Sequence, residues 1–326
     1  MKKLKKILLV FLLVFLLAGC TQPVTKEVSK NGKKKTEAVT YDKGKKATGQ
    51  RLTKNIICKP TNKELVEVYK ENKVNTDKLV DCEKFTPSIK DSEGIWDNIF
   101  IKPLAWVILK LGYLVKNFGL AVIIASIIIR LILYPVTKKS AMQSENLNKA
   151  QPELQRLEKK YANKTNDQQA MIQKSQEMMA IYKKYNISLM SGCIVAFLQL
   201  PLFIAFLEAI NRTPAIFEGK FLGLELGTTP IFAILKGNYA YLILPIIIFV
   251  VTYFSLKQNK NAAPTDSNPA AMSTKMMMNV MIFVITISSF NLSTAIGLYW
   301  IASSLFTIIQ NALIKRGGNN VRIKKS

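Results

Sequence analysis

The sequence predicts an all-α membrane protein with five transmembrane helices around a hydrophilic groove, a cytoplasmic helical hairpin and an exported N-terminal segment. Of its 326 residues, 49% are hydrophobic, yet the formal net charge is +25, which is typical of a membrane protein with basic connecting segments. Five apolar runs approach the ~20 residues that a helix needs to cross a ~30 Å hydrocarbon core. The predicted spans are residues 118–137, 188–210, 238–256, 276–292 and 293–314.

The N-terminus carries the pattern of a lipoprotein signal peptide over residues 1–20. Four lysines precede an apolar run, which ends in Leu17-Ala18-Gly19-Cys20 and is followed at once by polar residues. Small residues before the cysteine suit cleavage and lipidation of Cys20, which predicts a lipid anchor outside the cell. An uncleaved signal anchor with an incidental cysteine is the alternative interpretation.

Residues 21–94 are expected to form an extracytoplasmic tether with a small helical module. Residues 21–55 are rich in lysine, threonine and glycine and favour a solvated linker. A modest helical pattern follows and is flanked by Cys58 and Cys82. An exported segment permits a disulfide, so a bridge and two free thiols both remain open.

Residues 95–117 are amphipathic and contain aromatic residues that prefer the membrane surface. Lysines at positions 102, 110 and 116 interrupt the apolar run. The spacing therefore favours an interfacial helix over a sixth span.

Residues 138–187 change to a soluble helical pattern, with a polar break near 163–166. This predicts two helices and a turn, and the excess of lysine and arginine places the hairpin in the cytoplasm. Its methionines offer an adaptable apolar face or zip the two helices together, and the second role is expected for most of them. The remaining segments are an outer loop (211–237), a cytoplasmic loop (257–275) and a basic cytoplasmic tail (315–326).

Arg130 is the anomaly of the first span. A full charge near the centre of a spanning helix costs about 2.5–3.5 kcal/mol on insertion scales. Only Glu208 offers a carboxylate within the spans, and its depth differs from that of Arg130 by roughly 14 Å. The sequence therefore predicts a cation without an internal acidic partner, exposed to water in a groove.

Neutral polar residues at comparable depth would line that groove. Ser126 lies one turn before Arg130, and Gln199 lies at similar depth on the second predicted span. One face of the last span carries Trp300, Ser304, Thr307 and Asn311 at i, i+4, i+7 and i+11. Such a groove would attract a carboxylate of a passing polypeptide, an anionic lipid headgroup or a small anion.

Composition also argues against an enzyme. The chain has no histidine, which excludes a histidine-based triad or proton relay. The four cysteines have no metal-ligand spacing, and no nucleotide-binding loop is evident, so no cofactor is expected.

Several motifs, in order, resemble the YidC-type membrane protein insertases, which are related to the Oxa and Alb insertases of organelles. The matching pieces are residues 118–121, 130–135 with Thr137-Lys138, 151–154, 190–193, 198–205, 275–278, 297–301 and 308–310. The lipoprotein-type start and five spans resemble the Gram-positive branch. Residues 291–295 depart from the family's usual turn, which contains Phe-Pro.

The resemblance implies a membrane protein insertase and chaperone for nascent integral membrane proteins. It implies a groove open to cytoplasm and lipid, in which Arg130 attracts acidic residues of the client's exported segment. Tyr299 and Trp300 match a substrate-contacting aromatic region. The implied partners are nascent membrane proteins, ribosome–nascent chain complexes, the Sec translocon and membrane lipids, without sequence-specific nucleic acid binding. A small-anion or lipid transporter that uses the same groove is the alternative.

Overall fold

The structure is a computed structural model that describes residues 22–30, 33–42, 47–88, 94–163, 167–188, 191–257 and 274–323. The predicted signal peptide, Cys20 and most of the predicted loop 257–275 lie outside the described residues. The chain divides into two compact units. The first is Met1–Ser126, Leu200–Pro245 and Ser289–Trp300, and the second is Ile127–Gln199, Ile246–Ser288 and Ile301–Ser326.

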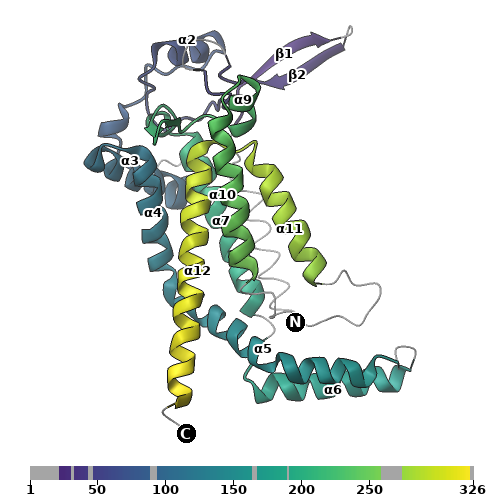
Figure 1. Ribbon diagram of the computed structural model, residues 1–326. Helices are drawn as coiled ribbons and strands as arrows, with labels where there is room; N and C mark the ends of the chain where they lie inside the picture. Colours follow the sequence, from purple (N-terminus) through teal and green to yellow (C-terminus); the bar gives the residue numbers. More distant parts are fainter. Residues whose placement is uncertain are drawn as a thin grey trace. The chain divides into compact units, whose positions relative to one another are not determined.

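The N-terminal part of the first unit is folded, so the prediction of a solvated linker over residues 21–55 is wrong. Strands β1 (Thr25–Lys30) and β2 (Lys33–Ala38) pair antiparallel, in the register Thr25↔Ala38 (Figure 1). A small apolar core lies beside them. Its buried members are Val24, Val39, Tyr41, Leu52, Ile56, Leu65, Tyr69 and Phe217. Most of the few apolar residues of this lysine-rich stretch are thus buried in the core. The average composition of the stretch does not reveal this, because lysine and threonine dominate it.

In the region where we expected a small helical module, the structure has one α-helix, α2 (Lys63–Glu71). The Asn62 side chain caps α2 by accepting a hydrogen bond from the Glu64 amide at 3.0 Å. A short 3₁₀ turn, η1 (Cys82–Lys84), follows. A disulfide joins Cys58 to Cys82, with the two Cα atoms 4.9 Å apart. Of the two alternatives that the sequence left open, the structure contains the bridge.

The next helix begins as a π-helical turn, η2 (Asp97–Ile101), and continues as α3 (Lys102–Val115). We predicted an interfacial helix, but Asp97–Val115 is long and apolar enough to cross a membrane. Lys102 does not break the apolar surface, because it is buried and its ammonium donates to the Ser88 carbonyl (2.8 Å) and the Asn98 side chain (3.1 Å).

The predicted outer loop is also folded. It contains α8 (Pro214–Phe217), the two-residue strands β3 (Lys220–Phe221) and β4 (Leu224–Glu225), and α9 (Pro230–Leu235). The 3₁₀ turn η3 (Tyr239–Leu242) follows at the start of the predicted third span. The side chains of Ile216, Phe217 and Leu226 are buried.

Each predicted span contains one long helix. These are α4 (Phe118–Ile132), α7 (Ser191–Asn211), α10 (Ile243–Lys257), α11 (Thr274–Ser289) and α12 (Thr294–Ile323). By length and composition, three helices of the described chain could cross a membrane: Asp97–Val115, Tyr239–Lys257 and Thr294–Arg316. A fourth candidate is the pair of α4 and the following helix, which is bent by 71°. The predicted span 118–137 is therefore not one straight helix, since the chain turns just before Pro135.

Helices α5 (Tyr134–Tyr161) and α6 (Gln168–Lys184) belong to the second unit and lie side by side (Figure 1). Two small clusters hold them together. The buried members are Ala150, Leu154 and Tyr182 in one, and Leu157, Tyr161 and Ala170 in the other. Met178 packs against both clusters. The side chain of Asp167 caps α6.

Candidate functional site

Arg130 of α4 is buried in the second unit, with 7% of its surface exposed. Its Nε donates a hydrogen bond to Ser303 Oγ of α12 at 2.9 Å. Its Nη2 donates to Gln199 Oε1 of α7 at 2.6 Å and also bonds to Ser303. Residues from three helices thus meet at one guanidinium, and neutral oxygens accept these hydrogen bonds.

This arrangement corrects part of the sequence prediction. We expected Arg130 to be exposed to water, but it is buried because Gln199 and Ser303 replace water as acceptors. Gln199 lies where the depth argument placed it. Ser126 is buried, and its hydroxyl donates to the Val122 carbonyl of its own helix at 2.6 Å, as serines in spanning helices commonly do.

We predicted that the groove face of α12 carries Ser304, but Arg130 contacts the neighbouring residue Ser303, which lies on the adjacent face of the helix. The residues of the selected face, Trp300, Ser304, Thr307 and Asn311, are all half-buried. The adjacent face carries Tyr299, Ser303 and Gln310, which are 1%, 2% and 6% exposed. Both faces have helical spacing, so periodicity alone could not choose between them. Ser303 and Gln310 were the residues that the sequence analysis missed.

Gln310 continues the same polar line along α12. Its Nε2 donates to Thr137 Oγ1 of α5 at 3.0 Å, and both residues are buried. Ser303 and Gln310 are seven residues apart, two helical turns on one face. We call the residues Arg130, Gln199, Ser303, Thr137 and Gln310 the polar seam.

Two aromatic pairs lie in the first unit. Tyr299 stacks on Phe206, with ring centroids 4.1 Å apart, and Trp300 meets Phe203 edge to face at 5.4 Å. Tyr299 is buried, whereas Trp300 is half-buried. Of the two aromatic residues that the resemblance assigned to substrate contact, Trp300 therefore has the more accessible side chain.

A buried ion network occupies another part of the first unit. Arg212 pairs with Asp97 and, at 3.5 Å, with Glu208, and its Nε donates to the Asn55 carbonyl at 2.8 Å. The two acids and the arginine are each less than 8% exposed. Glu208, the one carboxylate that we found within the spans, thus has an arginine partner four residues further on, just after the end of α7. That i,i+4 spacing is the signal that could have revealed the pair. Among the described residues no group of His, Cys, Asp and Glu could hold a metal ion.

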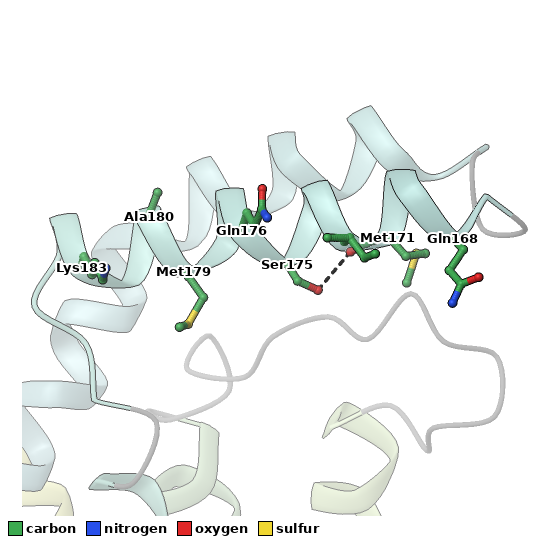
Figure 2. Close-up of a pocket in the computed structure, with 8 residues that line it drawn as sticks. Gln168, Met171, Ser175, Gln176, Met179, Ala180 and Lys183 are labelled. Atoms are coloured by element: carbon green, nitrogen blue, oxygen red, sulfur yellow. Dashed lines mark hydrogen bonds between the residues drawn. The ribbon is translucent and has the colours of Figure 1, made fainter.

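The α5–α6 pair presents a partly apolar hollow of about 620 Å³ along α6. Figure 2 shows Met171, Ser175 and Met179 on one side of the helix. Met179 is 53% exposed and Met142 of α5 is 49% exposed, whereas Met178 packs between the helices. Met178 thus holds the two helices together, whereas Met142 and Met179 leave apolar surface exposed.

Surface ion pairs join α5 to α6. Lys184 Nζ lies 2.6 Å from Glu153 Oε1, and Lys160 Nζ lies 2.6 Å from Glu177 Oε1. The hydrogen bonds from these lysines lower the pKa of both glutamates below its ordinary value. Both glutamates therefore stay ionised to a lower pH than a free glutamate, and exposed ion pairs of this kind contribute little to stability.

Known proteins are similar to this chain over most of its length. Residues 110–321 match the family described as the 60Kd inner membrane protein. A membrane protein insertase YidC of Oceanobacillus iheyensis is 31% identical over 233 residues, 71% of this chain and 87% of that protein. The membrane protein insertase MisCA of Bacillus subtilis is 34% identical over 230 residues, 70% of this chain and 82% of that protein.

One solved structure is also similar, a crystal structure of an active YidC insertase with its first transmembrane domain resolved. The TM-score is 0.47 at 24% identity, over 68% of this chain and 46% of that chain. The family match includes the polar seam, from Arg130 to Gln310, and leaves out the folded N-terminal part of the first unit. On the extent of the family match and of its relatives, this chain belongs to the family of the 60Kd inner membrane protein.

Proposed function

We propose that this protein is a bacterial membrane protein insertase and chaperone, which inserts nascent integral membrane proteins and helps them fold. The observation that carries the proposal is the family match over residues 110–321, together with relatives named as insertases that align over more than four fifths of their own length. Several helices of the described chain are apolar and long enough to cross a membrane, which supports a multi-pass membrane location.

In this proposal the polar seam is the resting form of a client-binding groove. Arg130 donates to Gln199 and Ser303, whose oxygens are neutral acceptors. A carboxylate adds an opposite charge to the hydrogen bond and can accept from the guanidinium through both oxygens, which a neutral hydroxyl or amide oxygen cannot do. An acidic residue of a client's exported segment would therefore displace the neutral acceptors when the groove opens.

The remaining groove residues would guide the client. The half-buried Trp300 and Ser304 of α12 would contact the client, whereas the buried Ser126 and Tyr299 would contribute packing within the first unit. The client's apolar helix would then move into lipid. Burial of its apolar surface, about 25 cal/mol per Å², would drive insertion without nucleotide hydrolysis.

The proposed topology has five spans, with the lipid-anchored N-terminus outside and the basic C-terminal tail in the cytoplasm. The basic α5–α6 hairpin would then face the cytoplasm. Its exposed Met142 and Met179 suit apolar clients of varied shape, since methionine side chains adapt to different partners. Ribosome–nascent chain complexes and the Sec translocon are the partners that we propose for this side.

The test is reconstituted insertion with variants at Arg130. Clients with an acidic exported segment are compared with matched neutral clients in vesicles. Arg130→Ala should lower insertion of the acidic clients about tenfold or more, because a charge-assisted hydrogen bond contributes about 1.5–3 kcal/mol. Arg130→Lys keeps the charge and should retain more of the activity.

The matched control is Arg316→Ala, which removes the same group from an exposed site on α12. It should leave both client classes unchanged. Equal losses for acidic and neutral clients with Arg130→Ala would contradict the proposed role of the charge.

A further inference from the structure

A second hollow of about 380 Å³ lies in the second unit, and three helices line it. Helix α5 contributes Glu145, Asn148 and Lys149, α10 contributes Lys257, and α12 contributes Asn311 and Lys315 among its residues. These residues are distinct from the polar seam. The hollow is therefore a separate feature, built from segments that are far apart in the sequence.

The lining carries an excess of positive charge. Three lysines, one from each helix, face a single acidic residue, Glu145, whose carboxylate lies 3.9 Å from Lys149 Nζ. The glutamate offsets one lysine and leaves two ammonium groups for a ligand. Asn148 and Asn311 add amide groups that can donate hydrogen bonds. A lining of this kind suits an anion with several oxygens.

The position of the hollow along the helices indicates what kind of anion. The candidate span Tyr239–Lys257 ends at Lys257, and the candidate span Thr294–Arg316 ends one residue after Lys315. Charged residues at the ends of spanning helices lie at the level of the lipid headgroups. Basic pockets between spanning helices on the cytoplasmic side bind the headgroups of anionic lipids.

Apolar surface continues from the hollow along α10. Val250 and Phe254 lie seven and three residues before Lys257 on the same face of that helix, and they are 42% and 51% exposed. A ligand with a charged head and acyl chains would match both surfaces. A free phosphate would not contact the exposed apolar surface beside the hollow. A nucleic acid backbone would place its charged phosphates against that apolar surface.

We propose that this hollow binds the headgroup of an anionic phospholipid from the cytoplasmic leaflet. Lys149, Lys257 and Lys315 hold the phosphate, Asn148 and Asn311 donate to its oxygens or to the glycerol, and the acyl chains lie along α10. Through that lipid, residues 141–149 of α5 are tied to two spans. The inference requires α10 and α12 to span the bilayer and does not depend on insertion activity.

The test is native mass spectrometry of the full-length protein in detergent, titrated with dioctanoyl phosphatidylglycerol. Dioctanoyl phosphatidylcholine, inorganic phosphate and a short RNA oligonucleotide are the comparison probes. The triple variant Lys149→Gln, Lys257→Gln, Lys315→Gln should bind phosphatidylglycerol at least tenfold more weakly, since each lysine near an anionic lipid strengthens binding by about fivefold. The control variant Lys138→Gln, Lys139→Gln, Lys159→Gln removes three exposed lysines of α5 that do not line the hollow, and should lose less than twofold.

Saturable binding of phosphatidylglycerol that only the pocket variant loses would support the proposal. Equal losses in the two triple variants would overturn it in favour of unspecific attraction. Binding of inorganic phosphate as tight as that of the lipid would overturn it in favour of a free-anion site. Lysine-dependent binding of RNA without binding of lipid would assign the hollow to a ribosomal contact instead.

Discussion

Ser303 and Ser304 are neighbours in the sequence, but only Ser303 accepts the hydrogen bonds of Arg130. Successive residues on a helix point about 100° apart, so one of them meets α4 while the other is half-buried. Ser303 is 2% exposed. Bulk water therefore cannot take the place of its hydroxyl as a hydrogen-bond acceptor for Arg130 unless the structure opens locally. At this scale, the Ser303 hydroxyl is one of the acceptors that hold Arg130, together with the Gln199 side chain.

We predict that Ser303→Ala lowers the free energy of unfolding by about 1–3 kcal/mol, the cost of leaving a buried donor without one of its acceptors. Ser304→Ala is the matched control and should change stability by less than about 0.5 kcal/mol. Thermal unfolding of both purified variants in one detergent gives the comparison. Identical melting temperatures for the two variants would argue against a role for Ser303 in holding Arg130.

At the scale of elements, the N-terminal part of the first unit is packed onto the segment that follows α7. The Glu218 carboxylate accepts hydrogen bonds from the Thr61 and Asn62 amides at the start of α2, both at 3.1 Å. Phe217 completes the small core around Leu65 and Tyr69. These partners lie about 150 residues apart along the chain, as with Asn62 and Glu218, separated by 156. The disulfide and these contacts together stabilise a folded module that includes residues for which the sequence predicted a solvated linker.

Gly49 tests this packing, because it has a φ of +72° and lies against the Phe232 ring of α9. A Cβ added there would be 2.4 Å from Phe232 Cγ. We predict that Gly49→Ala costs about 2–4 kcal/mol, the sum of backbone strain and overpacking. Gly237 has a φ of +83° with open space around it, so Gly237→Ala should cost only the strain, about 1 kcal/mol.

Limited proteolysis of the two glycine variants measures the difference. Cleavage within residues 22–88 should accelerate for Gly49→Ala alone. Equal cleavage of both variants would mean that the contact with Phe232 does not hold the module in place.

At the scale of the whole molecule, the distribution of charge sets the proposed topology. The net charge is +25, and the long segment before α3, which we propose to be exported, is itself rich in lysine. Long segments cross the membrane largely regardless of charge, whereas short basic segments beside spans stay inside. The topology therefore depends on the hairpin and the tail, and not on the exported segment.

Labelling of single introduced cysteines tests this orientation in intact cells. Asp77→Cys, on the exposed surface of the N-terminal module, should react with a membrane-impermeant maleimide. Lys159→Cys, exposed on α5, should react only after the cells are permeabilised. Labelling of Lys159→Cys in intact cells would reverse the proposed topology.

The sequence by itself determined the features that depend on neighbouring residues. Apolar runs located the helices α4, α7, α10, α11 and α12, the polar break at 163–166 separated α5 from α6, and one charge in an apolar run marked Arg130. Each of these features depends on the polarity of consecutive residues in the chain. They can therefore be identified from the sequence without knowing which other segments pack against them.

Only the tertiary structure decided which residues meet. It selected Ser303 over Ser304, paired Arg212 with Asp97 and Glu208, and turned a lysine-rich stretch into a folded module. Arg130 and Ser303 are 173 residues apart, and the rotation of each helix about its axis decides whether they touch. That rotation is fixed by the packing of several helices at once, and it therefore cannot be predicted from a local sequence pattern.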